Sequence, residues 1–276
     1  MIIDGREMAG EVLVRTKARA ARLTHPPRIL AIVANETSAT KSYLAIKKKR
    51  AADAGCELSV MTFGPDTTTE ELHTAVLSAD ADAVIVQLPL AEGMDSRIVC
   101  DAIPIGKDAD VLSFAARAKV EMKGLRNLSL LPPVVGAVQK ILEFGNVEIK
   151  GKQAVVIGSG FLVGAPVATW LTQQGADVSR VSFRFGDFSA CKDADIIVSG
   201  AGSPHFIKPE MLRQGVVLID AGTSESGGAL AGDADPACAE KCSIFTPVPG
   251  GVGPLAVACL FENVVTLAER ATKIQE

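Results

Sequence analysis

Short apolar runs rich in β-branched residues alternate with helical patterns along almost the whole chain, and this alternation constrains the fold more than any other feature. In the first part of the chain, residues 28–34, 57–63 and 83–88 are typical of buried strands. The stretches between them, at 40–54 and 69–78, have the periodicity of helices. Strands joined by helices in this way pair in parallel, with helices on both faces of the sheet. The pattern therefore predicts the α/β class.

A second series of the same kind follows and is more regular. Residues 106–129 break the alternation between the two series, and residues 145–151 look like a connection. The elements predicted after the break are helices at 133–144 and 163–173 and strands at 153–157, 177–183, 195–198, 216–221 and 242–245. We therefore expect two α/β domains with a boundary between residues 125 and 152. Periodicity does not decide which domain the last predicted helix, at about 255–274, packs against.

The composition argues against several classes of protein. With 276 residues, 48% of them hydrophobic and 22% charged, the chain has the profile of a soluble globular protein with room for two domains. A net charge of −4 without a basic tail argues against nucleic-acid binding. The sequence shows no secretory signal and no apolar run of membrane-spanning length. We expect a cytoplasmic protein without a membrane or nucleic-acid partner.

The cysteines and histidines do not have the spacing of metal ligands. Six cysteines and three histidines are scattered through the chain, and no Cys-x-x-Cys pair occurs. Cys238 and Cys242 have helical spacing, but no second pair completes a site. We expect reduced, mostly buried thiols and no bound metal.

A glycine-rich turn at residues 158–164 is the first candidate site. The sequence GSGFLVG follows a buried-looking strand and opens a helix, with the spacing G-x-G-x-x-x-G. Glycines permit a tight turn there, and the helix N-terminus would face a pyrophosphate. The next strand ends without the acidic residue expected on a ribose. Arg184 in that region either binds a ribose phosphate or is a solvated surface residue. A glycine-rich turn that binds no nucleotide is the alternative interpretation of residues 158–164.

A second group of candidates carries polar side chains. Thr40, Tyr43 and Lys47 lie three and four residues apart, on one face of a predicted helix. Gln87 ends the third predicted strand, where ligands bind in parallel sheets. Asp110 could take a bidentate hydrogen bond from an amidine-like heterocycle edge. A solvated lysine run and a capped turn are the alternative interpretations of these residues.

The run TPVPGGVGP at residues 246–254 holds three prolines and three glycines. Proline fixes φ and glycine permits φ > 0, so such a run builds one specific loop shape. It also leaves the backbone bare of side chains, so that a flat ligand could lie against it.

Taken together and in order, these features resemble the bifunctional methylenetetrahydrofolate dehydrogenase/methenyltetrahydrofolate cyclohydrolase family. The matching stretches are residues 2–5, 43–49, 86–90, 107–110, 151–152, 163–166, 215–222 and 246–254. The resemblance implies a catalytic folate domain at 1–130 plus 255–276, to which the C-terminal helix returns. It also implies a Rossmann-like dinucleotide-binding domain at 131–254 and a homodimer.

The resemblance also implies roles for individual residues. Lys47 would be the catalytic lysine, Gln87 would hydrogen-bond it and Asp110 would grip the pterin edge of a folate substrate. The implied folate-binding residues are Tyr43, Thr40, Pro249 and Gly250. The implied cofactor-binding residues are Gly158, Ser159, Gly160, Val163, Gly164, Arg184 and Gly202. The reaction would be NAD(P)-dependent oxidation of 5,10-methylenetetrahydrofolate, followed by hydrolysis to 10-formyltetrahydrofolate.

The departures from the family concentrate on the nucleotide half. Where the family has Gly-Arg-Ser, this chain has Gly158-Ser159-Gly160 and lacks the guanidinium that serves the NADP 2′-phosphate. Loss of such charged hydrogen bonds costs on the order of 1.5–3 kcal/mol. We expect NADP as cofactor, with NAD possible. The alternatives are a cyclohydrolase with weak or lost dehydrogenase activity, a non-catalytic folate- or nucleotide-binding paralogue, and a dehydrogenase for another substrate.

Overall fold

The computed structural model describes residues 1–121, 130–226 and 229–275. Its chain forms two compact units, each with its own parallel sheet. One comprises Met1–Ala9 and Val134–Ala256, and we call it the five-stranded unit. The other comprises Gly10–Pro133 and Val257–Glu276, and we call it the three-stranded unit.

The three-stranded unit is built from the first predicted βα series. Its strands are β1 (Arg28–Val33), β2 (Glu57–Thr62) and β3 (Ala83–Gln87), which pair in parallel in the order β2-β1-β3. Its shorter helices are α2 (Ser38–Asp53), α3 (Thr69–Leu77), α4 (Ser96–Asp101) and α5 (Phe114–Glu121). Four of the six residues of β1 are buried, including consecutive ones, so both faces of the central strand are covered. This is the pattern that a parallel sheet between helices requires.

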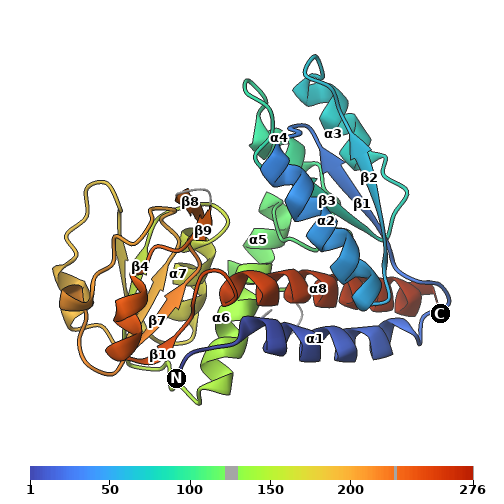
Figure 1. Ribbon diagram of the computed structural model, residues 1–276. Coiled ribbons are helices and arrows are strands. Elements are labelled where there is room, and N and C mark those ends of the chain that lie inside the picture. Colours follow the sequence, from blue (N-terminus) through green and yellow to red (C-terminus); the bar gives the residue numbers. More distant parts are fainter. Residues whose placement is uncertain (122–129, 227–228, 276) are drawn as a thin grey trace. The chain divides into compact units, whose positions relative to one another are not determined.

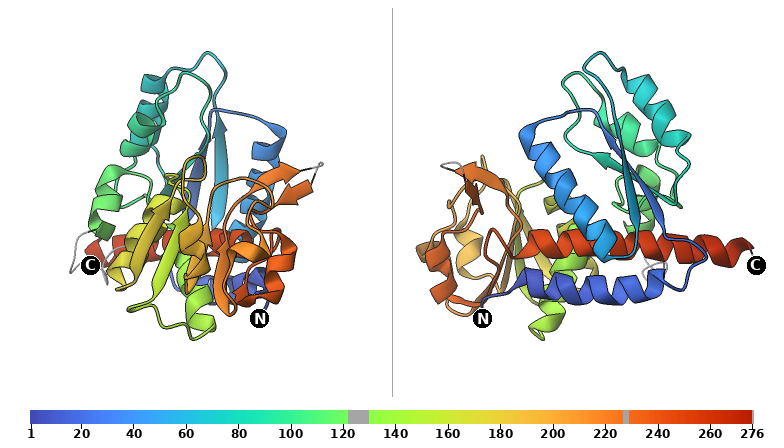
Figure 2. Two further views of the ribbon diagram at one scale, coloured as in Figure 1. Left: turned by 90° about the vertical axis from the view of Figure 1, so that its left-hand side faces the viewer. Right: turned by 45° about the vertical axis from the view of Figure 1, so that its right-hand side comes forward.

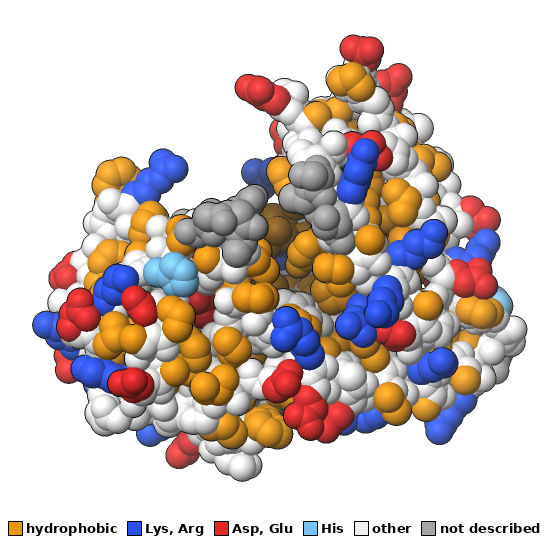
Figure 3. Space-filling view, viewed as in Figure 1, with side chains coloured by type: hydrophobic (Ala, Val, Ile, Leu, Met, Phe, Trp, Pro, Cys, Tyr) orange, Lys and Arg blue, Asp and Glu red, His pale blue; other side chains and the backbone are white. Residues whose placement is uncertain are grey.

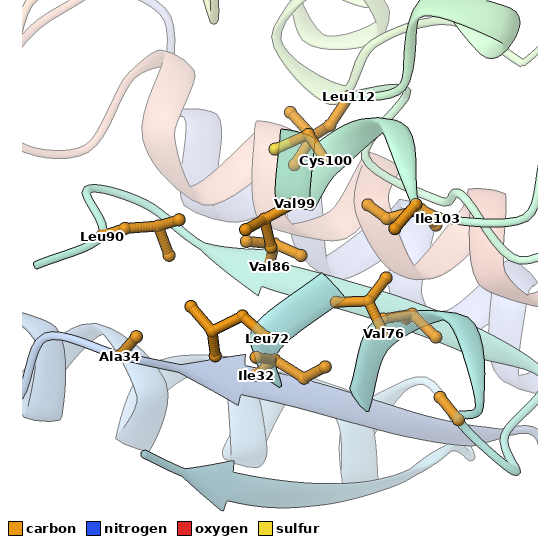
Figure 4. Close-up of a cluster of buried hydrophobic side chains, with 13 residues drawn as sticks. Ile32, Ala34, Leu72, Val76, Val86, Leu90, Val99, Cys100, Ile103 and Leu112 are labelled. Carbon is orange, nitrogen blue, oxygen red and sulfur yellow. The ribbon is translucent and has the colours of Figure 1, made fainter. Parts of the chain in front are cut away.

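One face of this sheet packs against α3 and α4. Ile32 and Val86 from the strands meet Leu72 and Val76 of α3 and Val99 of α4, and all five side chains are at most 2% exposed (Figure 4). The helix α3 begins with a capping box in which Thr68 and Glu71 bond to each other's backbone N–H groups. Local capping and a shared apolar face therefore agree on the same helix boundary.

The five-stranded unit is built from the second series. Its sheet contains β4 (Gln153–Ile157), β5 (Asp177–Val181), β6 (Ile196–Ser199), β7 (Val216–Asp220) and β10 (Cys242–Phe245), all parallel, in the order β10-β7-β6-β4-β5 (Figures 1 and 2). Its helices are α6 (Pro133–Phe144), α7 (Gly164–Gln173), η1 (Ser189–Lys192), η2 (Pro209–Met211) and η3 (Pro236–Glu240), with a small hairpin of β8 (Ser224–Ser226) and β9 (Ala229–Ala231). Trp170 of α7 is 5% exposed and belongs to the core of this unit.

The first nine residues lie in the five-stranded unit, whereas the resemblance implies that they belong to the catalytic domain. Ile2 bridges to Phe245 of β10, and Ile3 N–H donates to the Phe245 carbonyl at 2.9 Å. Phe245 N–H in turn donates to the carbonyl of Met1. These backbone bonds attach the segment to the edge strand, which periodicity alone does not reveal.

Two long helices complete the three-stranded unit. The larger parts of α1 (Gly5–Ala20) and α8 (Val252–Gln275) belong to it and run side by side (Figures 1 and 2). Arg19 of α1 forms a two-pronged ion pair with Glu269 of α8, at 3.0 and 2.7 Å. The side-chain amide of Asn263 in α8 donates to the carbonyls of Ala109 and Leu131. The C-terminal helix thus returns to the first domain, as predicted.

The prediction that no apolar run reaches membrane-spanning length is wrong for α8. Residues Val252–Lys273 are long and apolar enough to cross a membrane, with a mean hydropathy of 1.4 over the best window. However, 61% of that window is buried inside the protein, which is also typical of the core helix of a soluble fold. The burial of more than half of this segment accounts for its apolar composition.

The charged side chains on the molecular surface are mixed in sign. On the face drawn in Figure 3, Lys and Arg side chains are interspersed with Asp and Glu side chains. This distribution fits the small net charge of −4.

Candidate functional site

Lys47 is the centre of the polar cluster in the three-stranded unit. It lies in the third turn of α2 and is 7% exposed. Its Nζ donates a hydrogen bond of 3.0 Å to Oε1 of Gln87, the last residue of β3. The Gln87 amide nitrogen donates to the Leu88 carbonyl at 2.9 Å, which orients the amide oxygen toward the lysine. The lysine is thus buried, and its position is fixed by a neutral acceptor.

Tyr43 lies one helical turn before Lys47 on the same face of α2. The lysine Nζ is 5.6 Å from the centroid of the tyrosine ring. The residue is 46% exposed, so one part of the ring remains open to a ligand. Burial, and then the charge of Asp110, raise the pKa of the Tyr43 hydroxyl. The hydroxyl therefore stays protonated at neutral pH, and the ring offers a flat stacking surface.

Asp110 follows β3 in a segment that Asp108 holds in place. The buried Asp108 carboxylate accepts bonds from Leu112 N–H at 3.0 Å and from both the N–H and the hydroxyl of Ser113. Burial raises the pKa of Asp110, the charge of Lys47 opposes that rise, and the charge of Asp108 adds to it. Within the described part of the chain, no residue donates a hydrogen bond to the Asp110 carboxylate. That carboxylate is consequently available to a ligand.

Thr40, a predicted folate contact, lies beside the residue that caps α2. Its backbone N–H donates to Oγ1 of Thr37, the N-cap of α2, at 3.1 Å. The hydroxyl groups of Thr37 and Thr40 are 2.9 Å apart, and Thr40 is 8% exposed. Its hydroxyl therefore takes part in the cap that starts the helix carrying Tyr43 and Lys47.

The glycine-rich turn of the five-stranded unit connects β4 to α7. Gly158 has a φ of +97°, and a Cβ on Gly164 would overlap the carbonyl oxygen of Gly158. Only glycine fits both positions. Val163, the N-cap of α7, makes no side-chain capping bond, and a Cβ on Gly160 would meet nothing within 4 Å. The turn thus leaves an open cradle at an uncapped helix N-terminus, which fits the phosphates of a dinucleotide.

Two neighbouring loops leave the sheet beside this turn. Ile157 at the end of β4 pairs with Val181 of β5 and with Ser199 of β6, so the loops that follow these strands start at the same edge. Arg184 is exposed in the loop after β5. Among the residues that the structure describes, none forms a hydrogen bond or an ion pair with its guanidinium. Gly202, with a φ of +68°, lies in the loop after β6.

The run at 246–254 follows β10 in the same unit. Gly250 has a φ of +115° and is buried, and its carbonyl accepts a bond of 2.9 Å from Gly5 N–H. Gly251 N–H donates to the Pro247 carbonyl, and Thr246 Oγ1 accepts from the backbone N–H of Asp220 at 2.7 Å. Pro249 is exposed between these fixed points. The loop therefore has one well-defined shape with a bare backbone.

The predicted residues thus form two groups. Tyr43, Lys47, Gln87 and Asp110 come together in the three-stranded unit. The predicted cofactor residues line the loops after β4, β5 and β6 in the five-stranded unit, to which Pro249 and Gly250 also belong. Sequence reasoning missed Asp233, which accepts bonds from two backbone N–H groups of the loop after β6. The sequence signal for it is slight, since Asp233 is one of two aspartates in the stretch AGDADP at residues 231–236.

Metal ligands do not gather in the described residues. Across 1–121, 130–226 and 229–275, no three or more His, Cys, Asp or Glu side chains form a group that could hold a metal ion. The candidate chemistry in these residues is carried by a lysine, a carboxyl group and backbone amides.

Comparison with known proteins gives a consistent result along the chain. A family model described as the tetrahydrofolate dehydrogenase/cyclohydrolase NAD(P)-binding domain matches residues 132–272, and the catalytic-domain model of that family matches residues 3–110. The bifunctional protein FolD of Leuconostoc citreum is 35% identical over 277 residues, which cover 97% of this chain and 98% of the relative.

Solved structures agree with the sequence comparison. The bifunctional FolD methylenetetrahydrofolate dehydrogenase/cyclohydrolase from Campylobacter jejuni superposes with a TM-score of 0.91 at 28% identity, covering 98% of this chain and 99% of that one. The Trypanosoma brucei N5,N10-methylenetetrahydrofolate dehydrogenase-cyclohydrolase, solved with NADP cofactor and an inhibitor, gives a TM-score of 0.92 at 29% identity. It covers 99% of this chain and 98% of its own.

Proposed function

Since the chain belongs to the tetrahydrofolate dehydrogenase/cyclohydrolase family, we propose that it oxidises 5,10-methylenetetrahydrofolate with a nicotinamide nucleotide and hydrolyses the product to 10-formyltetrahydrofolate. The predicted family and the predicted two-domain α/β fold class are confirmed. The observation that carries the proposal is the 3.0 Å bond from Lys47 Nζ to Gln87 Oε1. A proton-transfer group held in this way is what the hydrolytic step needs.

The two reactions share one reacting carbon. In the first, the one-carbon bridge between two folate nitrogens loses a hydride, and the nucleotide supplies the hydride acceptor. In the second, water adds to the resulting methenyl carbon, one carbon–nitrogen bond breaks and one proton is released. Lys47 moves protons between the water-derived hydroxyl and the departing nitrogen, as a general acid and base. Gln87 holds Nζ in place for both transfers.

The polar cluster also offers what a folate needs for binding. The open part of the Tyr43 ring stacks on the flat heterocycle. Asp110, whose carboxylate is otherwise unbonded among the described residues, accepts a pair of hydrogen bonds from the amidine edge of the pterin. We assign Pro249 and Gly250 to the benzoyl portion, because their loop presents a bare backbone. We keep Thr40 in this folate site, in addition to its contact with Thr37 in the cap of α2.

For the nucleotide, we propose the glycine turn and its two neighbouring loops. Gly158, Gly160, Val163 and Gly164 shape the cradle for the pyrophosphate at the N-terminus of α7. Ser159 stands where the resemblance places an arginine, so that turn lacks a cation for a 2′-phosphate. Arg184, exposed in the adjacent loop, is the cation we assign to it.

Replacing Arg184 tests the assignment to NADP. Arg184→Gln should raise the Kd of NADP about tenfold or more, since a charged hydrogen bond to phosphate contributes about 1.5–3 kcal/mol. The Kd of NAD, which has no 2′-phosphate, should hardly change. Both values come from calorimetric titration. Arg180→Gln is the matched control, because Arg180 lies on β5 and contacts Thr169. An unchanged ratio of NADP to NAD affinity would remove Arg184 from the site.

The proposed function is tested by the decay of 5,10-methenyltetrahydrofolate, followed by its ultraviolet absorbance without nucleotide. Wild type should accelerate the decay, and Lys47→Met should be slower by about 10²- to 10⁴-fold, the usual contribution of a general acid and base. Methionine keeps the buried stem of the side chain and removes only the amine. Lys48→Met, at an exposed position on the same helix, should behave as wild type.

A specific observation keeps one alternative alive. Since Ser159 replaces the arginine, a cyclohydrolase with weak or lost dehydrogenase activity would show fast methenyl decay but no calorimetric binding of NADP or NAD. A non-catalytic paralogue would show no decay above buffer. The Lys47–Gln87 bond argues against a non-catalytic paralogue, since a protein that only binds folate does not need a buried lysine amine.

We also propose a cytoplasmic homodimer whose catalytic domain is formed by residues 10–130 and 255–276 and whose nucleotide domain extends from 131 to 254. Family resemblance supports the dimer and the location, and the two compact units support the division. Residues 1–9 are assigned to the nucleotide domain in this proposal. Sedimentation equilibrium should give a mass of about twice the 28.8 kDa of the chain, as a homodimer would.

A further inference from the structure

Asp233 is a fully buried carboxylate that the proposed chemistry does not use. It follows β9 in the five-stranded unit and is 0% exposed. It accepts a bond of 2.6 Å from Ser199 Oγ and bonds of 2.7 Å from the N–H groups of both Ala201 and Ser203. Two of these three donors are backbone groups of one loop, residues 200–203. The carboxylate therefore sets the path of that loop.

The loop at 200–203 is in contact with the glycine turn. A Cβ on Gly158 would be 2.8 Å from the Gly200 carbonyl oxygen, and a Cβ on Gly200 would be 2.8 Å from Cβ of Val163. The two segments thus touch without room for a methyl group. The loop at 200–203 thus packs directly against Gly158 and Val163, which we assign to the nucleotide, and a shift of this loop removes their support.

A second buried carboxylate holds Asp233 itself in place. Asp220, at the end of β7, is 1% exposed and accepts bonds of 2.9 Å from Gly222 N–H and 2.8 Å from Ala234 N–H. Ala234 directly follows Asp233, and a Cβ on Gly232 would overlap the Asp220 carboxylate. The contacts therefore form a series from β7 through residues 232–234 to the loop at 200–203.

Burying two carboxylates side by side is unfavourable unless hydrogen bonds replace the hydration that they lose. Burial, and then the negative charge of Asp233, raise the pKa of Asp220 to about 6. An apolar side chain at either position would leave buried backbone N–H groups without an acceptor, which is also unfavourable. Carboxylates are useful here because each can accept several backbone N–H bonds at once and so fix a loop that has no regular structure.

We infer that Asp233 is a positioning residue for nucleotide binding, which holds the loop at 200–203 against the glycine turn through Ala201 N–H and Ser203 N–H. The inference rests on the proposed function for its ligand, the nicotinamide nucleotide. Asp220 supports it by fixing residues 232–234. The nucleotide does not contact Asp233, which has no exposed surface.

Asp233→Asn is the decisive variant. An asparagine has the same shape but turns an NH₂ group toward one of the donors, so one loop N–H loses its acceptor. The Kd of NADP and NAD, measured by calorimetry, should rise about 10- to 100-fold. Amide exchange at Ala201 and Ser203, followed by NMR without nucleotide, should become faster. Decay of 5,10-methenyltetrahydrofolate without nucleotide should stay within about twofold of wild type.

Ser199→Ala is the matched control. It removes a bond to the same carboxylate from a residue that is also 0% exposed, but it leaves both loop N–H bonds in place. Thermal unfolding of both variants gives the stability loss. A purely structural role would raise the Kd in proportion to that loss in both variants, whereas positioning raises it in Asp233→Asn alone.

Each outcome has a distinct meaning. Wild-type affinity in Asp233→Asn, or equal weakening in both variants at equal stability loss, overturns the inference and leaves the proposed function intact. A wild type that binds neither NADP nor NAD refutes the dehydrogenase half of the proposed function, and the positioning role with it. If nucleotide binding is weaker and amide exchange is faster in Asp233→Asn but not in Ser199→Ala, the result supports the positioning role and the proposed function.

Discussion

Beside the carboxyl end of β3 the candidate chemistry is carried by side chains, whereas beside the carboxyl ends of β4 and β6 it is carried by backbone. Lys47, Tyr43 and Asp110 each supply a functional group of their own. In the five-stranded unit, the glycines of the turn carry no side chain. The buried carboxylates of Asp233 and Asp220 accept hydrogen bonds from backbone N–H groups of the neighbouring loops. A group that must move protons has to be a side chain, while a site that only cradles phosphates can be built from amides. The difference teaches where single substitutions should act.

The largest effect that would test this contrast is expected from Gly164→Ala. The new methyl group would overlap the Gly158 carbonyl oxygen, so the turn has to open. We expect NADP affinity to fall about 100-fold or more, equivalent to about 3 kcal/mol, at the upper end of overpacking costs. Calorimetry measures the affinity, and the nucleotide-free methenyl decay should be unaffected. Gly10→Ala is the control, because a Cβ there meets nothing within 4 Å.

Retained nucleotide binding in Gly164→Ala would break the comparison, since it would show that the cradle does not depend on close backbone contact. If Gly164→Ala lost methenyl hydrolysis as well as nucleotide binding, that result would contradict the comparison in another way. It would mean that the two groups of residues do not act separately.

The next effect concerns acid stability, which we assign to the carboxylates of the five-stranded unit. The folded protein holds the Asp220 proton up to about pH 6, whereas the unfolded chain releases it near the ordinary value of 3.8. The contribution of this group to the free energy of unfolding is therefore fully present below pH 4 and falls as the pH rises to 6. The fall is on the order of 3 kcal/mol.

Urea unfolding of wild type and Asp220→Asn at several pH values between 4 and 7 measures the contribution of Asp220 to the free energy of unfolding. The difference in unfolding free energy, wild type minus variant, should decrease over that interval and then level off. A difference that is constant with pH would mean that Asp220 has an ordinary pKa.

The smallest of these effects is expected in the three-stranded unit, from Gln87→Met. It removes the acceptor of the Lys47 bond and keeps the volume of the side chain. The rate of methenyl decay should fall about 10- to 100-fold, because a hydrogen bond to a charged group contributes about 1.5–3 kcal/mol. Nucleotide affinity should not change. An unchanged decay rate would show that the buried stem of Lys47 is enough to position it. Gln87 would then have no part in the chemistry of the three-stranded unit.

Much of the fold could be predicted from local sequence pattern. The predicted bounds of α6, β4 and β10 are those of the structure, and the other predicted strands end within two residues of the observed ones. The pattern did not lead to a prediction of α1, although its buried residues Ala9, Val12, Leu13, Thr16 and Ala20 have helical spacing. It was not sufficient for α4 either, which has only six residues. Strand order was out of reach, because pairing joins residues far apart in the chain.

The candidate sites show the same division. Lys47 and Gln87, forty residues apart, were found because resemblance preserves the identity of reactive side chains. Asp233 was not found, because its partners are backbone N–H groups that every residue except proline carries. The resemblance predicts that Thr40 binds the ligand, and the structure adds a contact of its hydroxyl with Thr37 in the helix cap. A sequence motif identifies side chains that react, whereas only the structure identifies side chains that hold backbone segments in place.

The packing of Trp170 in α7 has a practical consequence for all of these experiments. The chain contains one tryptophan and one tyrosine. The tryptophan is buried in the five-stranded unit, and the tyrosine stands beside Lys47 in the three-stranded unit. Each unit therefore carries its own intrinsic optical reporter. Selective excitation of the indole follows melting or ligand-induced change around α7, and tyrosine absorbance reports on the folate cluster, without any added label.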